Sequence, residues 1–179
     1  MESACIKVFR RQIKFGLSAA ILLGVLGQGS TALSCFLSKA SRDVLRLRDT
    51  EYAELPEGLC PGYSDTLLGK TQQFEYGGVV CDRTEGSYIF LQRLVGYTPQ
   101  KRAIWKIVEI QRLAQTKDNE RVVSAGCIHT QKSNQPIFAV VETSQAPNYK
   151  VLRAWAIDLE QEQLKPMPSK WAACTDPLF

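Results

Sequence analysis

The two residues of this sequence with the clearest capacity for chemistry are Cys127 and His129, the latter being the only histidine of the chain. Residues two apart on a β-strand share a face, so this thiol and imidazole could bind a metal or act as a nucleophile with its base. The chain supplies no second histidine for a metal site. After export, Cys127 would instead form a disulfide, whose sulfur is neither a nucleophile nor a good ligand. We therefore favour a disulfide at Cys127 and an ordinary side chain at His129.

A second candidate is Gly69-Lys70-Thr71, which has the residue types found at the end of a phosphate-binding loop. That motif needs a further glycine five residues before the second one, so that backbone amides can curl around the phosphates. The residue at that position is Ser64, and no apolar strand precedes it. We interpret the segment as a surface turn.

Carboxylate pairs are the third candidate, because two acidic side chains can hydrolyse a glycosidic bond. Glu109, Glu142 and Asp158 all fall on expected strands, where acidic residues usually face water. The sequence holds no Gly-x-Ser-x-Gly elbow for a serine nucleophile. Aromatic residues could line a ligand groove, but their spacing on strands favours the core. These aromatic residues are Trp105, Trp155, Trp171, Tyr88, Phe90 and Phe138.

The N-terminal segment predicts export. Basic residues at 7, 10, 11 and 14 precede an uncharged apolar run over 15–27 and then small residues. This order is typical of a signal peptide, which we place at residues 1–34. An uncleaved membrane anchor is the alternative. Cys35 could also carry a lipid, although Ala32-Leu-Ser-Cys35 matches a lipoprotein signal only in part, because Leu33 is the second and not the third residue before the cysteine.

The charge of the chain changes once this segment is set aside. The full sequence has 22 basic and 18 acidic residues, and residues 1–34 hold four of the basic residues and one of the acidic residues. The remaining residues have a net charge of +1. A nearly neutral domain gives no reason to expect nucleic acid as a partner, nor a membrane except through the N-terminal lipid or anchor.

Export also decides how the cysteines are interpreted. Four cysteines remain beyond Cys35, which is enough for two disulfides. We predict the pairs Cys60–Cys81 and Cys127–Cys174, which would join the front loop to the first strand and the C-terminal tail to the sheet. Four cysteines allow three pairings, so the other two remain open.

The elements that position these residues are mostly expected strands. Residues 35–75 are expected to hold a short helix over 36–47 and then an irregular loop over 49–73, where glycine and proline are frequent. Residues 76–179 are expected to form the β domain. Its strands are expected at 77–81, 87–95, 103–113, 121–129, 137–142 and 149–158. Connections of this length favour antiparallel pairing. We predict an α+β, mainly β fold: one antiparallel sheet of about five or six strands, stabilised by disulfides.

These observations bound the function without naming it. The sequence shows no nucleophile–base pair, no metal-ligand set and no cofactor loop, so we predict no catalytic, metal or cofactor-binding residues and no cofactor. We expect an exported, non-enzymatic module that binds a protein or another component of the cell envelope. The alternative is a small secreted hydrolase that uses carboxylates.

Overall fold

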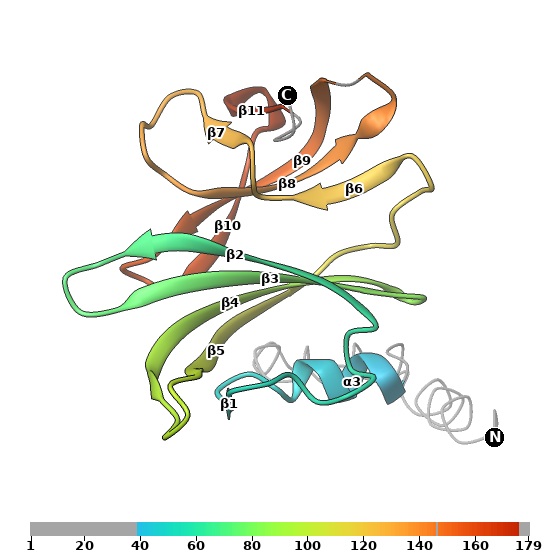
Figure 1. The fold of residues 1–179 in the computed structure, drawn as a ribbon. Coiled ribbons are helices and arrows are strands. Elements are labelled where there is room, and N and C mark those ends of the chain that lie inside the picture. The colour runs from blue at the N-terminus through green and yellow to red at the C-terminus, as the bar shows by residue number, and fades with distance from the viewer. Residues whose placement is uncertain (1–38, 146, 176–179) are drawn as a thin grey trace, which may run out of the picture. The chain divides into compact units, whose positions relative to one another are not determined.

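The computed structural model describes residues 39–145 and 147–175, and most of these residues lie in β-strands (Figure 1). Among them, the helices are α3 (Lys39–Leu45), η1 (Thr143–Gln145) and η2 (Ser169–Trp171). The strands are β1 (Glu51–Tyr52), β2 (Gly62–Lys70), β3 (Glu75–Arg83), β4 (Gly86–Tyr97), β5 (Ala103–Arg112), β6 (Glu120–Val123), β7 (Cys127–His129), β8 (Ile137–Glu142), β9 (Asn148–Asp158), β10 (Gln163–Met167) and β11 (Ala172–Thr175). No helix in this part of the chain is long and apolar enough to span a membrane. The chain divides into two compact units, Met1–Asp43 and Val44–Phe179, and all strands belong to the second.

The first five strands form one antiparallel sheet, called here the N-terminal sheet, in the order β1-β5-β4-β3-β2. From β2 to β5 each strand pairs with the next. Residues 84–85 link β3 to β4 and residues 98–102 link β4 to β5, and connections this short can join only antiparallel neighbours. Consecutive residues of β3, such as Val79 and Val80, are both buried, so both faces of this sheet are covered.

The remaining strands form the C-terminal sheet, in the order β6-β8-β9-β11-β7, with β10 pairing with β9 beside β11. The central strand β8 is apolar over its first five residues, which are all buried. Cys127 on β7 faces Cys174 on β11 directly, and the two form a disulfide. The crosslink therefore holds the last strand onto the sheet.

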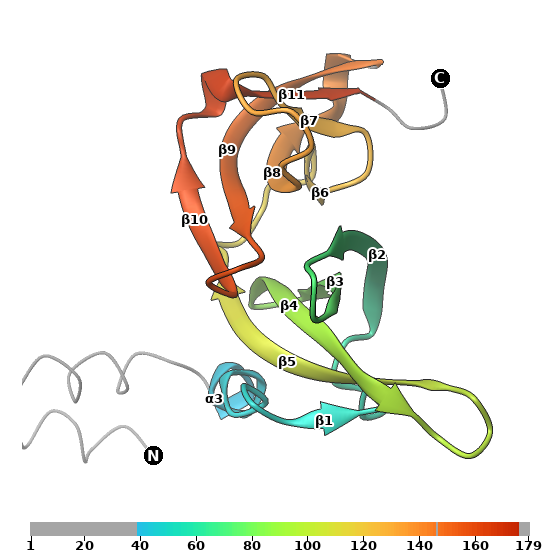
Figure 2. The same cartoon turned by 90° about the vertical axis from the view of Figure 1, so that its left-hand side faces the viewer.

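The two sheets pack face to face and enclose the main core (Figures 1 and 2). Phe138 of β8 is fully buried and lies over Gly78 of β3, where a Cβ would come within 2.4 Å of the ring. A hydrogen bond also links the two sheets, because the Glu109 carboxylate on β5 accepts from the Leu164 amide on β10. The core residues come from both sheets: Tyr76, Val80, Ile89, Leu91, Val108, Leu113, Val122, Phe138, Val140, Trp155, Ile157 and Leu164.

The outer face of the N-terminal sheet is covered by residues 44–60. Leu47, Tyr52, Leu55 and Leu59 pack against a second cluster of buried residues there: Val44, Val79, Cys81, Tyr88, Phe90 and Ile107. The Cys60–Cys81 disulfide fastens the end of this segment to β3. Both disulfides expected from the sequence are thus present.

The prediction of a single sheet is wrong, because the strands divide between two sheets that stack. The expected loop over 49–73 also contains two strands, β1 and β2. β2 lies at the edge of its sheet, and most of its side chains are exposed on both faces, so its sequence lacks the alternation of a half-buried strand. The helix expected over 36–47 is present as α3 within the described residues. The expected signal peptide at 1–34 and Cys35 lie outside them.

Candidate functional site

Cys127 and His129 do not form a reactive pair. Cys127 is bonded to Cys174. His129 is buried, and its Nδ1 accepts hydrogen bonds from the backbone amides of Gln131 and Lys132, at 3.1 and 3.2 Å. Its ring also stacks on Trp171, with the centroids 6.3 Å apart. The imidazole therefore holds the turn that follows β7, which is a structural role.

Two of the three carboxylates singled out in the sequence, Glu142 and Asp158, lie far apart. Glu142 pairs with Lys150 at the start of β9, whereas Asp158 ends the same strand eight positions later. At about 3.3 Å per residue, the two are separated by roughly 25 Å, whereas paired glycosidase carboxyls lie about 5–9.5 Å apart. Glu142 and Asp158 are therefore not placed as a pair for acid–base catalysis. Glu109 accepts a hydrogen bond from the Leu164 amide, so this carboxylate has a structural partner.

The environment of Asp158 also argues against a catalytic acid. Its carboxylate accepts hydrogen bonds from Lys165 Nζ at 2.7 Å and from the Gln161 amide at 3.0 Å. These bonds, the lysine bond foremost, hold the pKa of Asp158 below its ordinary value. A general acid of a glycosidase needs the opposite shift. Asp158 instead shapes the turn between β9 and β10.

The aromatic residues mostly fill the core, as the strand spacing predicts. Tyr88, Phe90 and Phe138 are fully buried, and Trp155 is 8% exposed. Trp105 and Trp171 are half-buried. None of these side chains lines the larger cavity described next.

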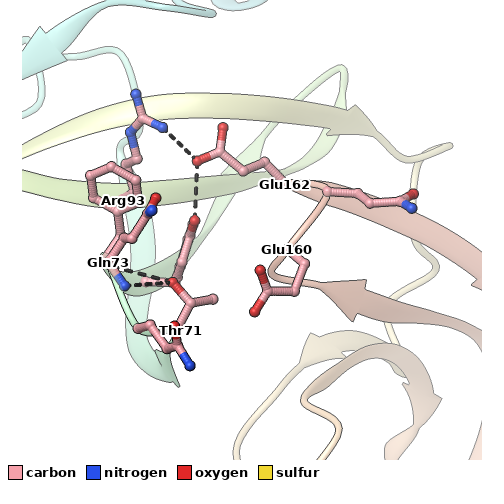
Figure 3. Close-up of a pocket in the computed structure, with 9 residues that line it drawn as sticks. Thr71, Gln73, Arg93, Glu160 and Glu162 are labelled. Atoms are coloured by element: carbon pink, nitrogen blue, oxygen red, sulfur yellow. Dashed lines mark hydrogen bonds and ion pairs between the residues drawn. The ribbon is translucent and has the colours of Figure 1, made fainter.

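One cavity among the described residues, larger than another that is lined by Asp82 and Arg83, lies between two turns that are far apart in the sequence (Figure 3). One turn joins β2 to β3 and the other joins β9 to β10. The cavity has a volume of about 390 Å³ and opens to solvent. Its lining residues are Thr71, Gln72, Gln73, Phe74, Tyr76, Arg93, Glu160, Gln161 and Glu162. We call this site the two-turn pocket.

Of the Gly69-Lys70-Thr71 segment, only Thr71 lines this pocket. The Thr71 hydroxyl accepts hydrogen bonds from the backbone amides of Gln73 and Phe74, and the Thr71 amide donates to the Phe74 carbonyl. The amides of Gln73 and Phe74 are therefore directed at the threonine hydroxyl and are not free to surround a phosphate. Gly69 and Lys70 end strand β2, and Thr71 begins a turn that its own side chain stabilises, so the segment is not a phosphate-binding loop.

An ion pair joins the two sides of the pocket. Arg93 on β4 contacts the Glu162 carboxylate at 2.8 Å, and the Tyr76 hydroxyl donates to the same oxygen at 3.1 Å (Figure 3). The Arg93 guanidinium also lies 4.5 Å from the centre of the Phe74 ring, a cation–π contact. Phe74 in turn meets Tyr76 edge to face. These four side chains fix the floor of the pocket.

The second turn is fixed by its own contacts. Lys165 Nζ donates to both Asp158 and the Gln161 side chain, each at 2.7 Å. Glu162 adopts a positive φ of 53°, a conformation that non-glycine residues rarely take. This conformation occurs at the residue whose carboxylate binds Arg93 and Tyr76. Glu160 precedes it by two residues, and its carboxylate forms no hydrogen bond or ion pair with any described residue.

Tyr76 gives the pocket a measurable response to alkaline pH. Burial, together with the adjacent Glu162 carboxylate, raises the pKa of Tyr76 above its ordinary value of 10.0. The unfolded chain therefore releases this proton first as the pH rises, so stability is lost from about pH 10 upward and is unaffected below it. We expect Tyr76→Phe to make the fall in unfolding free energy between about pH 9 and 11 shallower, as followed by urea denaturation.

Two other tyrosines decide how the result for Tyr76→Phe is interpreted. Tyr52 is half-buried and also has a raised pKa, with desolvation as the main cause, so part of the alkaline fall remains in the variant. Tyr97→Phe is the matched control, because the Tyr97 side chain is 62% exposed. Parallel pH curves for the wild type and Tyr76→Phe would contradict the assignment.

Among the pocket residues, only Thr71 belongs to a candidate motif of the sequence, and that motif is interpreted there as a surface turn. Most of the other pocket residues lie on two turns about ninety positions apart, Tyr76 and Arg93 lie on strands β3 and β4, and no local pattern links them. The described residues include no group of three or more His, Cys, Asp or Glu side chains placed to hold a metal ion.

Comparisons of the chain with models of protein families, with curated proteins and with solved structures give no match.

Proposed function

We propose that this protein is an exported binding module of the cell envelope and that the two-turn pocket is its ligand site. The observation that carries the proposal is the state of the charged groups in that pocket. Arg93 and Glu162 are paired with each other, and the Tyr76 hydroxyl is directed at the same carboxylate. A site whose charged side chains are already paired with each other is better suited to bind a ligand than to transfer protons.

Export rests on the expected signal peptide at residues 1–34 and on the two disulfides. Disulfides persist in oxidising compartments and are rare in the cytosol. Both connect elements that would otherwise be held only by short strands or by irregular chain. The protein therefore belongs in the periplasm or outside the cell, and it would be tethered there if Cys35 carries a lipid or if the N-terminal segment stays as an anchor.

The alternative is a small secreted hydrolase. The observation in its favour is that two carboxylates, Glu160 and Glu162, line one pocket (Figure 3). Against it, the Glu162 carboxylate is already held by the Arg93 guanidinium and the Tyr76 hydroxyl. Glu160 would then have to act without a partner acid.

Sedimentation with isolated cell envelopes of the host tests the proposal. We expect the purified protein to sediment with the envelopes in a saturable manner and to release no soluble fragments, as analysed by mass spectrometry. Failure to sediment would contradict a binding function. Released fragments that disappear with Glu160→Gln would replace the binding module with the hydrolase.

A further inference from the structure

We infer that the two-turn pocket binds a neutral saccharide. This inference rests on the proposed binding function and names the chemical class of its ligand. It is carried by the kinds of groups that line the pocket, by the charges that remain there and by the rigidity of its walls.

The first argument concerns polarity. A cavity of about 390 Å³ falls within the range of small-molecule sites, about 300–1,000 Å³, but such sites are usually lined by apolar side chains. This pocket is lined mainly by amide, hydroxyl and charged side chains, and Phe74 and Tyr76 are its only aromatic members. An apolar ligand would leave these polar groups without partners, which is costly when water is excluded. The ligand must itself carry many hydrogen-bonding groups.

The second argument concerns charge. The charges of Arg93 and Glu162 balance each other, so the pair offers no net charge to an anion or to a cation. The pocket side chains without a partner among the described residues include the amides of Gln72 and Gln73 and the carboxylate of Glu160. An amide has both donors and an acceptor, and a carboxylate has two acceptor oxygens. Vicinal hydroxyl groups of a sugar can donate to and accept from such planar groups at the same time.

The third argument concerns rigidity. The Thr71 hydroxyl fixes the turn that carries Gln72 and Gln73, and Lys165 fixes the turn that carries Glu160. Phe74 is held in place by the Arg93 guanidinium and the Tyr76 edge. A pocket already held in its binding shape loses less entropy on association, which matters for sugars because their hydroxyls also bind water well. Phe74, which is half-buried, supplies apolar surface that the C–H face of a sugar ring can contact.

Titration of the 15N-labelled purified protein with cellobiose, maltose and N,N′-diacetylchitobiose tests the inference by NMR. At least one of these should shift the amide signals of residues 71–74 and 160–162. Gln72→Ala with Gln73→Ala should weaken the affinity about tenfold or more, because each truncation removes hydrogen bonds to the ligand. Both side chains are exposed, so the fold should not change. Gln131→Ala is the matched control, since Gln131 is an exposed glutamine outside the pocket, and it should leave the affinity unchanged.

Titration with spermidine, and titrations of the variant Glu160→Gln, distinguish a saccharide ligand from a cationic ligand. Glu160→Gln keeps the hydrogen-bonding shape and removes the charge, so we expect a saccharide affinity within about threefold of the wild type. Shifts produced by spermidine alone, and lost with Glu160→Gln, would overturn the saccharide assignment. Saccharide shifts outside residues 71–74 and 160–162 would overturn the site. The absence of shifts with all three saccharides, combined with continued sedimentation with envelopes, would overturn the inference and leave the proposed binding function standing.

Discussion

Phe138→Ala is expected to lower the free energy of unfolding by about 3–5 kcal/mol, the range for removing a large buried aromatic side chain. Phe138 is fully buried between the two sheets, at the centre of the core they share. The cavity left behind cannot close easily, because both walls are paired strands: β8 lies between β6 and β9, and β3 lies between β2 and β4. Urea denaturation followed by tryptophan fluorescence measures the loss.

The contact between Phe138 and Gly78 gives this prediction an internal check. A Cβ at Gly78 would lie 2.4 Å from the Phe138 ring and 3.1 Å from Leu68, so Gly78→Ala should cost about 1–3 kcal/mol through overpacking. Phe138→Leu provides space at the same point, and in that background Gly78→Ala should cost less. Gly62→Ala is the matched control, because a Cβ there meets no atom within 4 Å. Additive costs of the two changes would show that the ring and the glycine do not share this contact.

Removal of the Cys127–Cys174 disulfide is expected to have the second large effect. The two cysteines are 47 positions apart, and for a loop of that length the chain-entropy estimate gives about 4 kcal/mol. The native state depends on this bond in particular, because β7 has three residues and β11 has four. The paired variant Cys127→Ala/Cys174→Ala should therefore unfold at markedly lower urea concentration than the oxidised wild type.

The neighbouring residue Ile128 provides the control for the disulfide variant. Its side chain is 63% exposed on the same strand, so Ile128→Ala should change stability by no more than about 0.5 kcal/mol. The paired cysteine variant should also release the C-terminal strand, seen as faster hydrogen exchange at residues 172–175. A loss of stability below about 1 kcal/mol in that variant would mean that strand pairing alone holds β11 in place.

The parts of the fold that could be predicted are those fixed by local composition. Val79 to Cys81, Tyr88 to Leu91 and Ile137 to Val141 are apolar or β-branched runs, and each lies in a strand. The prediction of the two disulfide pairs is confirmed, although the sequence left two other pairings open. The division into two sheets did not follow, because no local pattern says which strands stack and which pair.

Strand β9 shows how an irregularity alters the interpretation of a sequence pattern. Strict alternation predicts Val151, Arg153, Trp155 and Ile157 on one face. In the structure a register shift between Val140 and Val141 of the partner strand moves Val151 to the opposite face, with Ala154, while Leu152 packs toward the main core. A bulge inserts one extra residue and reverses the faces beyond it. The residues on the far side of the bulge, Trp155 and Ile157, keep the predicted face.

The candidate site could not be predicted from the sequence, for a related reason. The sequence offers three acidic residues on strands as catalytic candidates: Glu109, Glu142 and Asp158. In the structure, each of these carboxylates is bound by a neighbouring amide or amine. The residues that do converge lie on two turns, which show no periodicity, and on the strands that carry Tyr76 and Arg93. Arg93 and Glu162 are brought together only because the C-terminal sheet stacks on the N-terminal one.

The two hydrogen-bonded turns that form the pocket also bear on how fast a ligand would come and go. Thr71 and Lys165 already hold these turns in position, so a ligand would enter without waiting for a loop to close. The rate of association would then be limited by diffusion of the ligand to the pocket and not by a rearrangement of the protein. A weakly bound sugar would dissociate and bind again many times within one NMR measurement. Signals from residues 71–74 and 160–162 would accordingly move continuously during a titration, instead of vanishing at one position and reappearing at another.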